Sequence, residues 1–171
     1  MPLRCMTLCG ILLTLSAAQA AAQPESGLNL TTFAGMAMVP GAHAVLGVAV
    51  GVKPRDQVPV SLEFEYARTR SDPAGGVPSI ASFVGNILIH PSRHPPGLRI
   101  YGTIGAGLYV QILNRRSSEA NDAWNIGGGI KIALAGPLQL RLDYRSFFLA
   151  PVTGEYHSNE HRVYAGITLG Y

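Results

Sequence analysis

The residues that could carry out catalysis lie near the end of the chain. His157 and Ser158 are adjacent, and Glu155 and Glu160 are close by. A serine that is activated by a histidine and an acid is the arrangement of a nucleophilic hydrolase. The same residues also suit a polar surface loop, which is the simpler interpretation. We therefore assign no catalytic residue.

Two pairs of histidines have the spacing of metal ligands. They are His90 with His94, and His157 with His161. Residues four apart can bind one metal ion when they lie on one face of a helix. Pro91 and Pro95 exclude a helix at the first pair, and the second pair spans the junction of a loop and a strand. We therefore expect no metal site.

Glycine-rich segments at 102–107 and 127–129 raise the question of a phosphate-binding loop. Neither segment contains G-x-G-x-x-G at a strand-to-helix turn or a Walker sequence. We therefore expect no cofactor. The basic residues are spread singly and no RNA-binding motif is present, so we do not expect nucleic acid as a partner.

The remaining polar chemistry consists of charged residues that alternate with apolar ones. We assign eight of them to one inner face, as a network of lumen charges: Glu63, Glu65, Arg99, Lys131, Arg141, Asp143, Arg145 and Arg162. Burying an unpaired charge is expensive in free energy. If these residues face an interior, they must therefore compensate one another.

These charges lie in segments with a period of two, which is the spacing of a β-strand. Residues 98–112 place mostly Ile, Leu and Val at even positions, and Gly, Thr and Tyr at most odd positions. Residues 124–134 and 138–145 repeat the pattern. Small inward residues suit a narrow tube, and a continuous aliphatic outer face then requires lipid around it.

Eight such segments occur along the chain, each of roughly ten residues, the length that a tilted strand needs to cross a bilayer. Long polar segments at 68–79, 114–122 and 149–160 follow the third, fifth and seventh strands. Long outer loops and short periplasmic turns are typical of transmembrane barrels. We predict an all-β fold, an eight-stranded antiparallel up-and-down transmembrane β-barrel.

The start of the chain has the three regions of a secretory signal peptide, with Arg4, an apolar run and small residues up to position 22. We expect residues 1–22 to be the signal, cleaved after Ala20 or Ala22, and residues 23–171 to be the barrel domain. Both cysteines lie in the signal, so the mature chain has no disulfide. No later segment has the roughly 18 apolar residues of a membrane-spanning helix.

Four segments resemble those of the small eight-stranded outer-membrane barrels, the OmpA/OmpX-like superfamily. They are YGTIGAGLY (101–109), WNIGGGIKI (124–132), LRLDYR (140–145) and the ending HRVYAGITLGY (161–171). The resemblance implies a location in the bacterial outer membrane after export through the periplasm. Members of this superfamily serve as membrane anchors, surface-exposed interaction proteins and, rarely, lipid-modifying enzymes.

Residues at the strand ends suggest two further roles. Ile167, Leu169 and Tyr171 resemble the C-terminal signal that the outer-membrane assembly machinery reads. Aromatic side chains at the ends of strands are typical of the girdles at membrane interfaces. The predicted girdle comprises Tyr66, Trp124, Phe148 and Tyr171.

The turn at 135–137 allows two registers for its hairpin. If the turn is centred on Gly136, Lys131 lies opposite Arg141. If it is centred on Pro137, Lys131 lies opposite Asp143. Like charges that oppose each other directly are destabilising. We therefore predict that Lys131 faces Asp143.

Taken together, these features predict a non-enzymatic, monomeric outer-membrane barrel without an open pore, with a structural role or an interaction role through its outer loops. Its expected partners are outer-membrane lipid, lipopolysaccharide and the assembly machinery. One alternative is a lipid A deacylase-like enzyme, because such barrels use Ser and His near the outer rim. Another is a soluble lipocalin-type binding barrel, which would place the aliphatic face inside.

Overall fold

The computed structural model describes residues 27–38, 41–54, 58–70, 79–91, 95–113, 116–117, 120–150 and 159–170. The strands within these ranges are β1 (Gly27–Met38), β2 (Ala42–Lys53), β3 (Val60–Thr69), β4 (Ser79–Ile89), β5 (Leu98–Leu113), β6 (Arg116–Ser117), β7 (Asn121–Ala133), β8 (Leu138–Leu149) and β9 (Asn159–Gly170). No helix in the described ranges is long and apolar enough to cross a membrane. The predicted signal peptide and Tyr171 lie outside the described residues.

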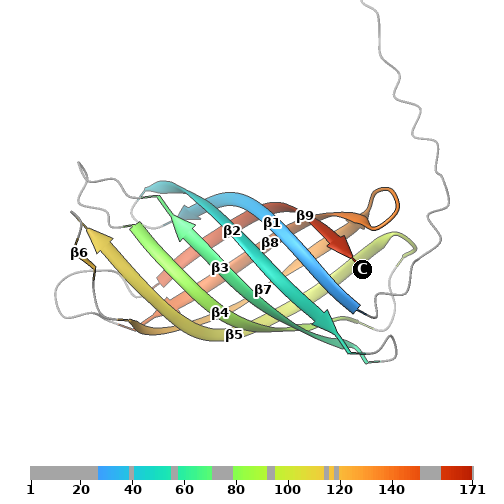
Figure 1. The fold of residues 1–171 in the computed structure, drawn as a ribbon, viewed down its shortest axis with the longest axis horizontal. Helices are drawn as coiled ribbons and strands as arrows, with labels where there is room; N and C mark the ends of the chain where they lie inside the picture. Colours follow the sequence, from blue (N-terminus) through green and yellow to red (C-terminus); the bar gives the residue numbers. More distant parts are fainter. Residues whose placement is uncertain are drawn as a thin grey trace, which may run out of the picture.

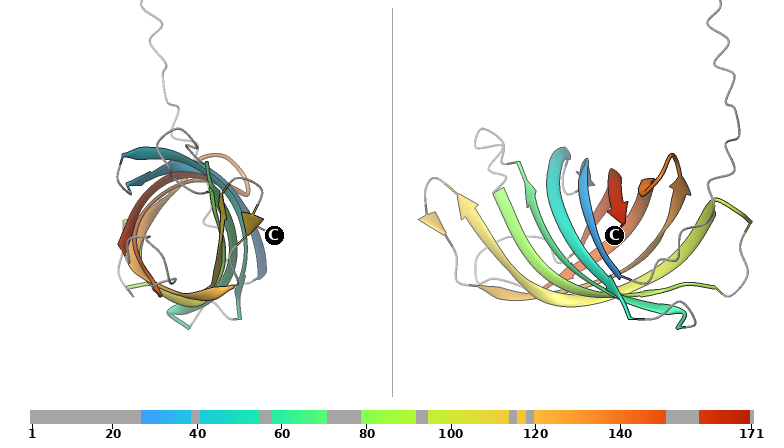
Figure 2. Two further views of the ribbon diagram at one scale, coloured as in Figure 1. Left: turned by 90° about the vertical axis from the view of Figure 1, so that its left-hand side faces the viewer. Right: turned by 45° about the vertical axis from the view of Figure 1, so that its right-hand side comes forward.

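Eight of these strands close into an antiparallel barrel. Each long strand pairs with its neighbours in sequence, β4 pairs with β5, and β1 pairs with β9 to complete the ring. Figure 1 shows the steeply tilted strands from the side, and the left view of Figure 2 shows the ring end-on. The predicted eight-stranded fold is confirmed. The short β6 pairs only with the end of β5, inside a segment that we had predicted as loop.

The two faces of the wall are those that the alternation predicts. Most large apolar side chains of the outer face are 37–71 % exposed, with Phe64 at the upper limit, while a few, such as Ile130 and Leu140, are partly buried. Even the least regular strand, β4, keeps the pattern, because Ser82 and Asn86 point inward and are at most 2 % exposed. An aliphatic outer face and a polar interior are the reverse of a soluble lipocalin-type barrel, so that alternative is wrong.

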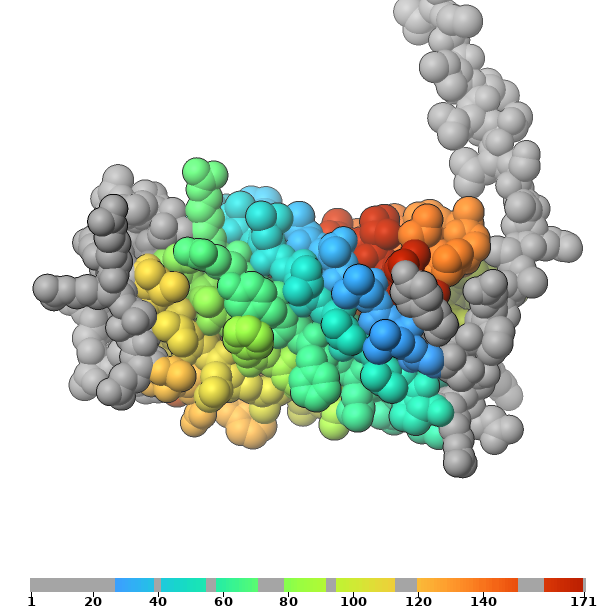
Figure 3. Space-filling view, viewed as in Figure 1, coloured from blue at the N-terminus to red at the C-terminus, as the bar shows by residue number. Residues whose placement is uncertain are grey.

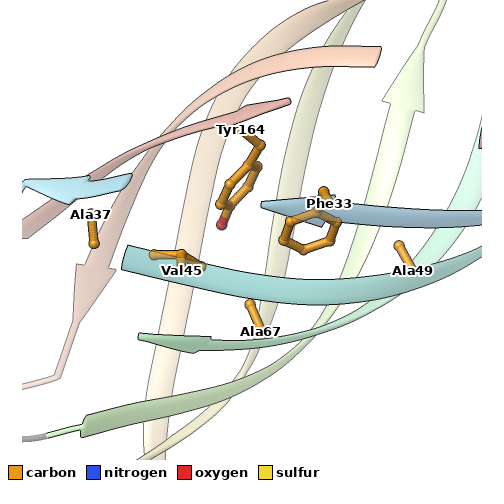
Figure 4. Packing of buried hydrophobic residues seen from close by; sticks show 6 residues of the cluster. All are labelled: Phe33, Ala37, Val45, Ala49, Ala67 and Tyr164. Atoms are coloured by element: carbon orange, nitrogen blue, oxygen red, sulfur yellow. The ribbon is translucent and has the colours of Figure 1, made fainter. Parts of the chain in front are cut away.

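Small residues line much of the interior, which is narrow because only eight strands form the ring. Figure 4 shows the rings of Phe33 and Tyr164 in one buried cluster with the smaller side chains of Val45, Ala49 and Ala67. The two ring centroids are 4.6 Å apart. Gly47 lies beside this pair, and a Cβ atom there would overlap the Phe33 ring. Glycine and alanine at inward positions thus make room for the few large side chains that enter the lumen.

The connections differ in length at the two ends of the barrel. Connections of six, eight and four residues join β2 to β3, β4 to β5 and β7 to β8 at the end where β1 begins and β9 ends, on the right in Figure 1. At the other end, nine residues follow each of β3 and β8, seven separate β5 from β7, and only three join β1 to β2. Because the longest connections face outward in outer-membrane barrels, we expect the first end to be periplasmic and the second to face outward, and we call them the periplasmic end and the outer end.

The predicted register of the β7–β8 hairpin is wrong. The structure pairs Lys131 with Arg141 and places Asp143 opposite Gly129. Gly136, the middle residue of the turn, has a φ of 55°, a left-handed conformation that glycine adopts readily, and the backbone N–H of Leu138 donates to the carbonyl of Ala135 at 3.1 Å to close the turn. Turn geometry therefore set the register, and the like charges are compensated by other strands.

The outer face should reject a charge at mid-membrane and tolerate one at the rim. Ile126 lies in the middle of β7 and is 54 % exposed to the lipid side. We expect Ile126→Arg to lower the free energy of unfolding by about 2–4 kcal/mol, and Leu134→Arg at the periplasmic end by about 0–1 kcal/mol. Urea unfolding in lipid vesicles, monitored by the single tryptophan, measures both. Equal losses would contradict the assigned membrane depth.

Candidate functional site

Eight charged side chains are buried inside the described part of the barrel, and their formal charges sum to zero. The acids are Glu63, Glu65, Asp143 and Glu160, and the bases are Lys131, Arg141, Arg145 and Arg162. None is more than 5 % exposed. The structure thus brings seven of the eight predicted lumen charges into the interior. The eighth, Arg99, is half-buried near the periplasmic end of β5.

The centre of the network joins opposite walls of the barrel. β3 and β8 are four strands apart in either direction around the ring, so a contact between them crosses the whole lumen. Arg141 on β8 makes a two-pronged ion pair with Glu63 on β3, with Nη2 donating to Oε1 at 3.0 Å and Nη1 donating to Oε2. Its Nε also donates to Asp143 Oδ2 at 2.6 Å. Two-pronged pairs of this kind fix geometry as well as charge.

Arg145, four residues further along β8, makes a second bridge to β3. Its Nη1 donates to Glu65 Oε2 at 2.6 Å, and its Nη2 donates to Glu63 Oε1 at 3.1 Å. The side chain is fully buried. Glu63 is therefore shared by two arginines, and both glutamates of β3 are held by β8.

Tyr101 on β5 explains why Lys131 and Arg141 can lie opposite each other. Its hydroxyl donates to Asp143 Oδ1 at 2.7 Å and accepts from Arg141 Nε at 2.8 Å. Its ring lies under both cations, 5.7 Å from Lys131 Nζ and 5.3 Å from Arg141 Cζ. Cations are attracted to the face of an aromatic ring. The ring and the neighbouring carboxylates thus offset the repulsion that we had used to choose the other register.

A second ion pair lies nearer the outer end. Arg162 on β9 donates from Nε to Glu160 Oε1 at 2.9 Å and from Nη2 to Oε2 at 3.0 Å, and its guanidinium carbon lies 4.2 Å from the centroid of Phe147. Tyr164 joins this pair to the central network, because it accepts from Arg162 at 3.4 Å and donates to Glu65 at 3.3 Å. The polar contacts therefore run along most of the lumen.

Sequence reasoning missed Glu160. We had placed it in the loop at 149–160, but β8 extends to Leu149 and β9 begins at Asn159, and Glu160 is fully buried. The signal was present, because Glu160, Arg162 and Tyr164 alternate on one face. Tyr101 was assigned to the inner face, but its part in the network was not recognised.

The structure also places most of the residues predicted for the membrane interfaces. Trp124 and Phe148 are register partners near the outer end and are 60 % and 45 % exposed. The ring centroids of Tyr66 and Phe83 are 4.7 Å apart. Ile167 and Leu169 lie on the outer face of β9, and Tyr171 falls outside the described residues. The girdle and the assembly signal stay predictions.

The candidate catalytic residues are not brought together by the described part of the chain. His157, Ser158 and Glu155 fall outside it, as does His94. Glu160 is held by Arg162 and points into the lumen. His161 points outward and shares a 3.0 Å hydrogen bond with the Tyr144 hydroxyl, and His90 shares one of 2.9 Å with Ser61. Each of the four buried carboxylates has an arginine partner, so the network is suited to bracing the barrel.

Comparisons with known proteins agree with this architecture. The family model described as outer membrane protein beta-barrel domain matches residues 7–168. No curated protein sequence matches the chain. Neisserial surface protein A has 11 % identity and a TM-score of 0.67, over 84 % of this chain and 96 % of that one. The N-terminal β-barrel domain of Pseudomonas aeruginosa OprF has 15 % identity and a TM-score of 0.58, over 84 % and 97 %.

An enzyme is also among the similar structures. The outer membrane enzyme PagL has 10 % identity and a TM-score of 0.55, over 84 % of this chain and 99 % of that chain. At these identities the likeness shows the fold alone. The family match, in contrast, covers most of the chain.

Removing one member of the network should leave buried charge without a partner. We expect Glu63→Gln to lower the free energy of unfolding by about 3–5 kcal/mol, because Arg141 and Arg145 both lose a carboxylate. The double variant Glu63→Gln/Arg141→Gln should recover part of this loss. The matched control is Asp122→Asn on the exposed outer face, which should change stability by less than about 0.5 kcal/mol. Additive single and double effects in urea unfolding would contradict the coupling.

Proposed function

The chain belongs to the outer membrane protein β-barrel family and resides in the bacterial outer membrane, and from this we propose that it is a non-enzymatic barrel with a closed lumen. Its role is then structural or exerted through the segments that join the strands at the outer end. The observation that carries the proposal is the ion network that bridges β3 and β8. A barrel crossed by charge pairs from wall to wall has no continuous path for hydrated ions.

Barrel size supports the same conclusion. Eight strands leave an interior just wide enough for side chains to fill, whereas barrels of about 16–18 strands leave an aqueous channel. Here the interior holds four arginine and lysine side chains, four carboxylates, and the rings of Tyr101, Tyr164 and Phe33. Opening a pore would require several buried ion pairs to separate at once, which is costly because each desolvated charge would lose its partner.

Conductance measurements test the closed lumen. We expect the purified protein to show no stable channel in planar bilayers, while a 16-stranded porin inserted under the same conditions serves as the positive control. Heat-modifiable migration on a gel should show that the inserted protein is folded. Steady conductance of porin size from folded protein would refute the proposal while leaving the fold intact.

A lipid-modifying activity is the competing function, supported by the likeness of fold to the outer membrane enzyme PagL. It depends on Ser158, which lies outside the described residues. The lipid A acylation pattern of cells with the native protein and with Ser158→Ala separates the two functions. A pattern that shifts with the native protein and not with the variant would replace our proposal with the enzyme.

Cleavage of the signal after Ala20 or Ala22 and recognition of the C-terminus by the assembly machinery belong to the same proposal. Strand β9 ends with Ile167 and Leu169 on the lipid side, in phase with Tyr171. We expect deletion of Tyr171 to reduce the amount of heat-modifiable, membrane-inserted protein, and Tyr171→Phe to preserve it, because an aromatic ring is retained. Unchanged insertion after the deletion would show that assembly reads another feature.

A further inference from the structure

An apolar groove opens on the lipid-facing side of β2, β3 and β4. Its walls are the rings of Phe64 and Phe83, which are 71 % and 65 % exposed, and its floor is at Gly85, which faces outward beside Phe64 in the strand register. Val48 and Val50 continue the groove onto β2. These strands, coloured cyan to yellow-green, occupy the face toward the viewer in Figure 3. The missing side chain of glycine is what creates the hollow.

Two arginines lie between this groove and the outer end of the barrel. Arg68 follows Phe64 and Tyr66 on the outward side of β3, Arg70 lies just beyond the end of that strand, and both are exposed. With a strand rise of about 3.3 Å and a tilt of about 40°, Arg68 lies about 10 Å above Phe64 along the membrane normal. Arg68 Nε donates to Ser79 Oγ at 3.1 Å, which positions its guanidinium over the end of β4.

We propose that this surface is a binding site for a phosphorylated glycolipid of the outer leaflet, the lipid A type, with one acyl chain in the groove and a phosphate on Arg68 and Arg70. Charge complementarity supports this occupant, because guanidinium groups bind phosphate oxygens through two parallel hydrogen bonds. Tyr66, whose ring packs against Phe83, lies between Phe64 and Arg68 along β3, where an aromatic side chain of the membrane interface is expected. Position in the membrane supports it too, since the outer end of the barrel meets only the outer leaflet.

The size of the groove limits what it can hold. At about 310 Å³ it lies at the lower end of the roughly 300–1,000 Å³ of small-molecule sites. One acyl chain is therefore accommodated and the remaining chains stay in the bilayer. A Cβ atom added to Gly85 would be 3.6 Å from the Phe64 ring, an ordinary contact, so a larger side chain can fill the groove without straining the wall.

This inference makes specific the partnership with outer-membrane lipid and lipopolysaccharide that the sequence predicts, and it is independent of the closed lumen. Native mass spectrometry of the membrane-extracted protein tests it with three probes: lipid A with both phosphates, the same lipid A after dephosphorylation, and phosphatidylcholine. We expect one bound lipid A with two phosphates, and about tenfold weaker binding of the other two lipids. Equal binding of all three would overturn the proposal.

Variants separate the two halves of the site. Arg68→Gln/Arg70→Gln should weaken binding of lipid A with two phosphates about tenfold, and Arg68→Lys/Arg70→Lys should retain most of it because the charges stay. Lys53→Gln, which removes a charge at the periplasmic end, is the matched control. Gly85→Leu should weaken binding of both forms of lipid A, whereas Ala165→Leu on the outer face of β9 should not.

Heat-modifiable migration identifies the variants that fold, and only these enter the comparison. Binding that is unchanged by the double glutamine variant, or lowered as much by Lys53→Gln, would overturn the phosphate site. Binding that is unchanged by Gly85→Leu would overturn the acyl-chain groove. Because none of these measurements depends on conductance, a failed site and an open lumen would be told apart.

Discussion

Ion pairs between opposite walls are the interaction on which the rest of this barrel depends. Closing eight strands into a ring leaves little interior volume, and this chain places eight charges in it. Arg141 and Arg145 on β8 are neutralised by Asp143 on their own strand and by Glu63 and Glu65 on β3, which they reach across the full width of the lumen. The inward glycine and alanine residues follow from that requirement, because they leave room for the long side chains to extend.

Compared with a soluble domain, this barrel has its apolar side chains outside and its charged side chains inside. The outer face and the interior are stabilised for different reasons. The aliphatic outer face is stable because lipid surrounds it, and the closed ring leaves no strand edge with unpaired backbone groups in the hydrocarbon. The polar interior is stable because each buried carboxylate has an arginine partner. The aliphatic outer face would be unstable in water.

Because the lumen is filled by the ion network, the surface of the barrel is where contacts with other molecules can form. The network fills the lumen and holds the opposite walls at a fixed separation, so contacts with other molecules are left to the outer end and the lipid-facing side. On that side, the apolar hollow at Gly85 and the exposed Arg68 lie on neighbouring strands of the outward face. The rigidity of the wall would keep the two parts of that surface at a constant spacing.

The sequence by itself determined the strands, their faces, the closure into a barrel and the membrane location, because a period of two with an aliphatic outer face is local information. Even the irregular β4 followed it. The register of β7 and β8 was decided by the left-handed Gly136, and the compensation of Lys131 and Arg141 came from Tyr101 and from Glu63, which is 78 residues away from Arg141 in sequence. The place of Glu160 likewise depended on where β9 begins. Pairings across a lumen are set by closure and turn geometry, and these appear only in the folded barrel.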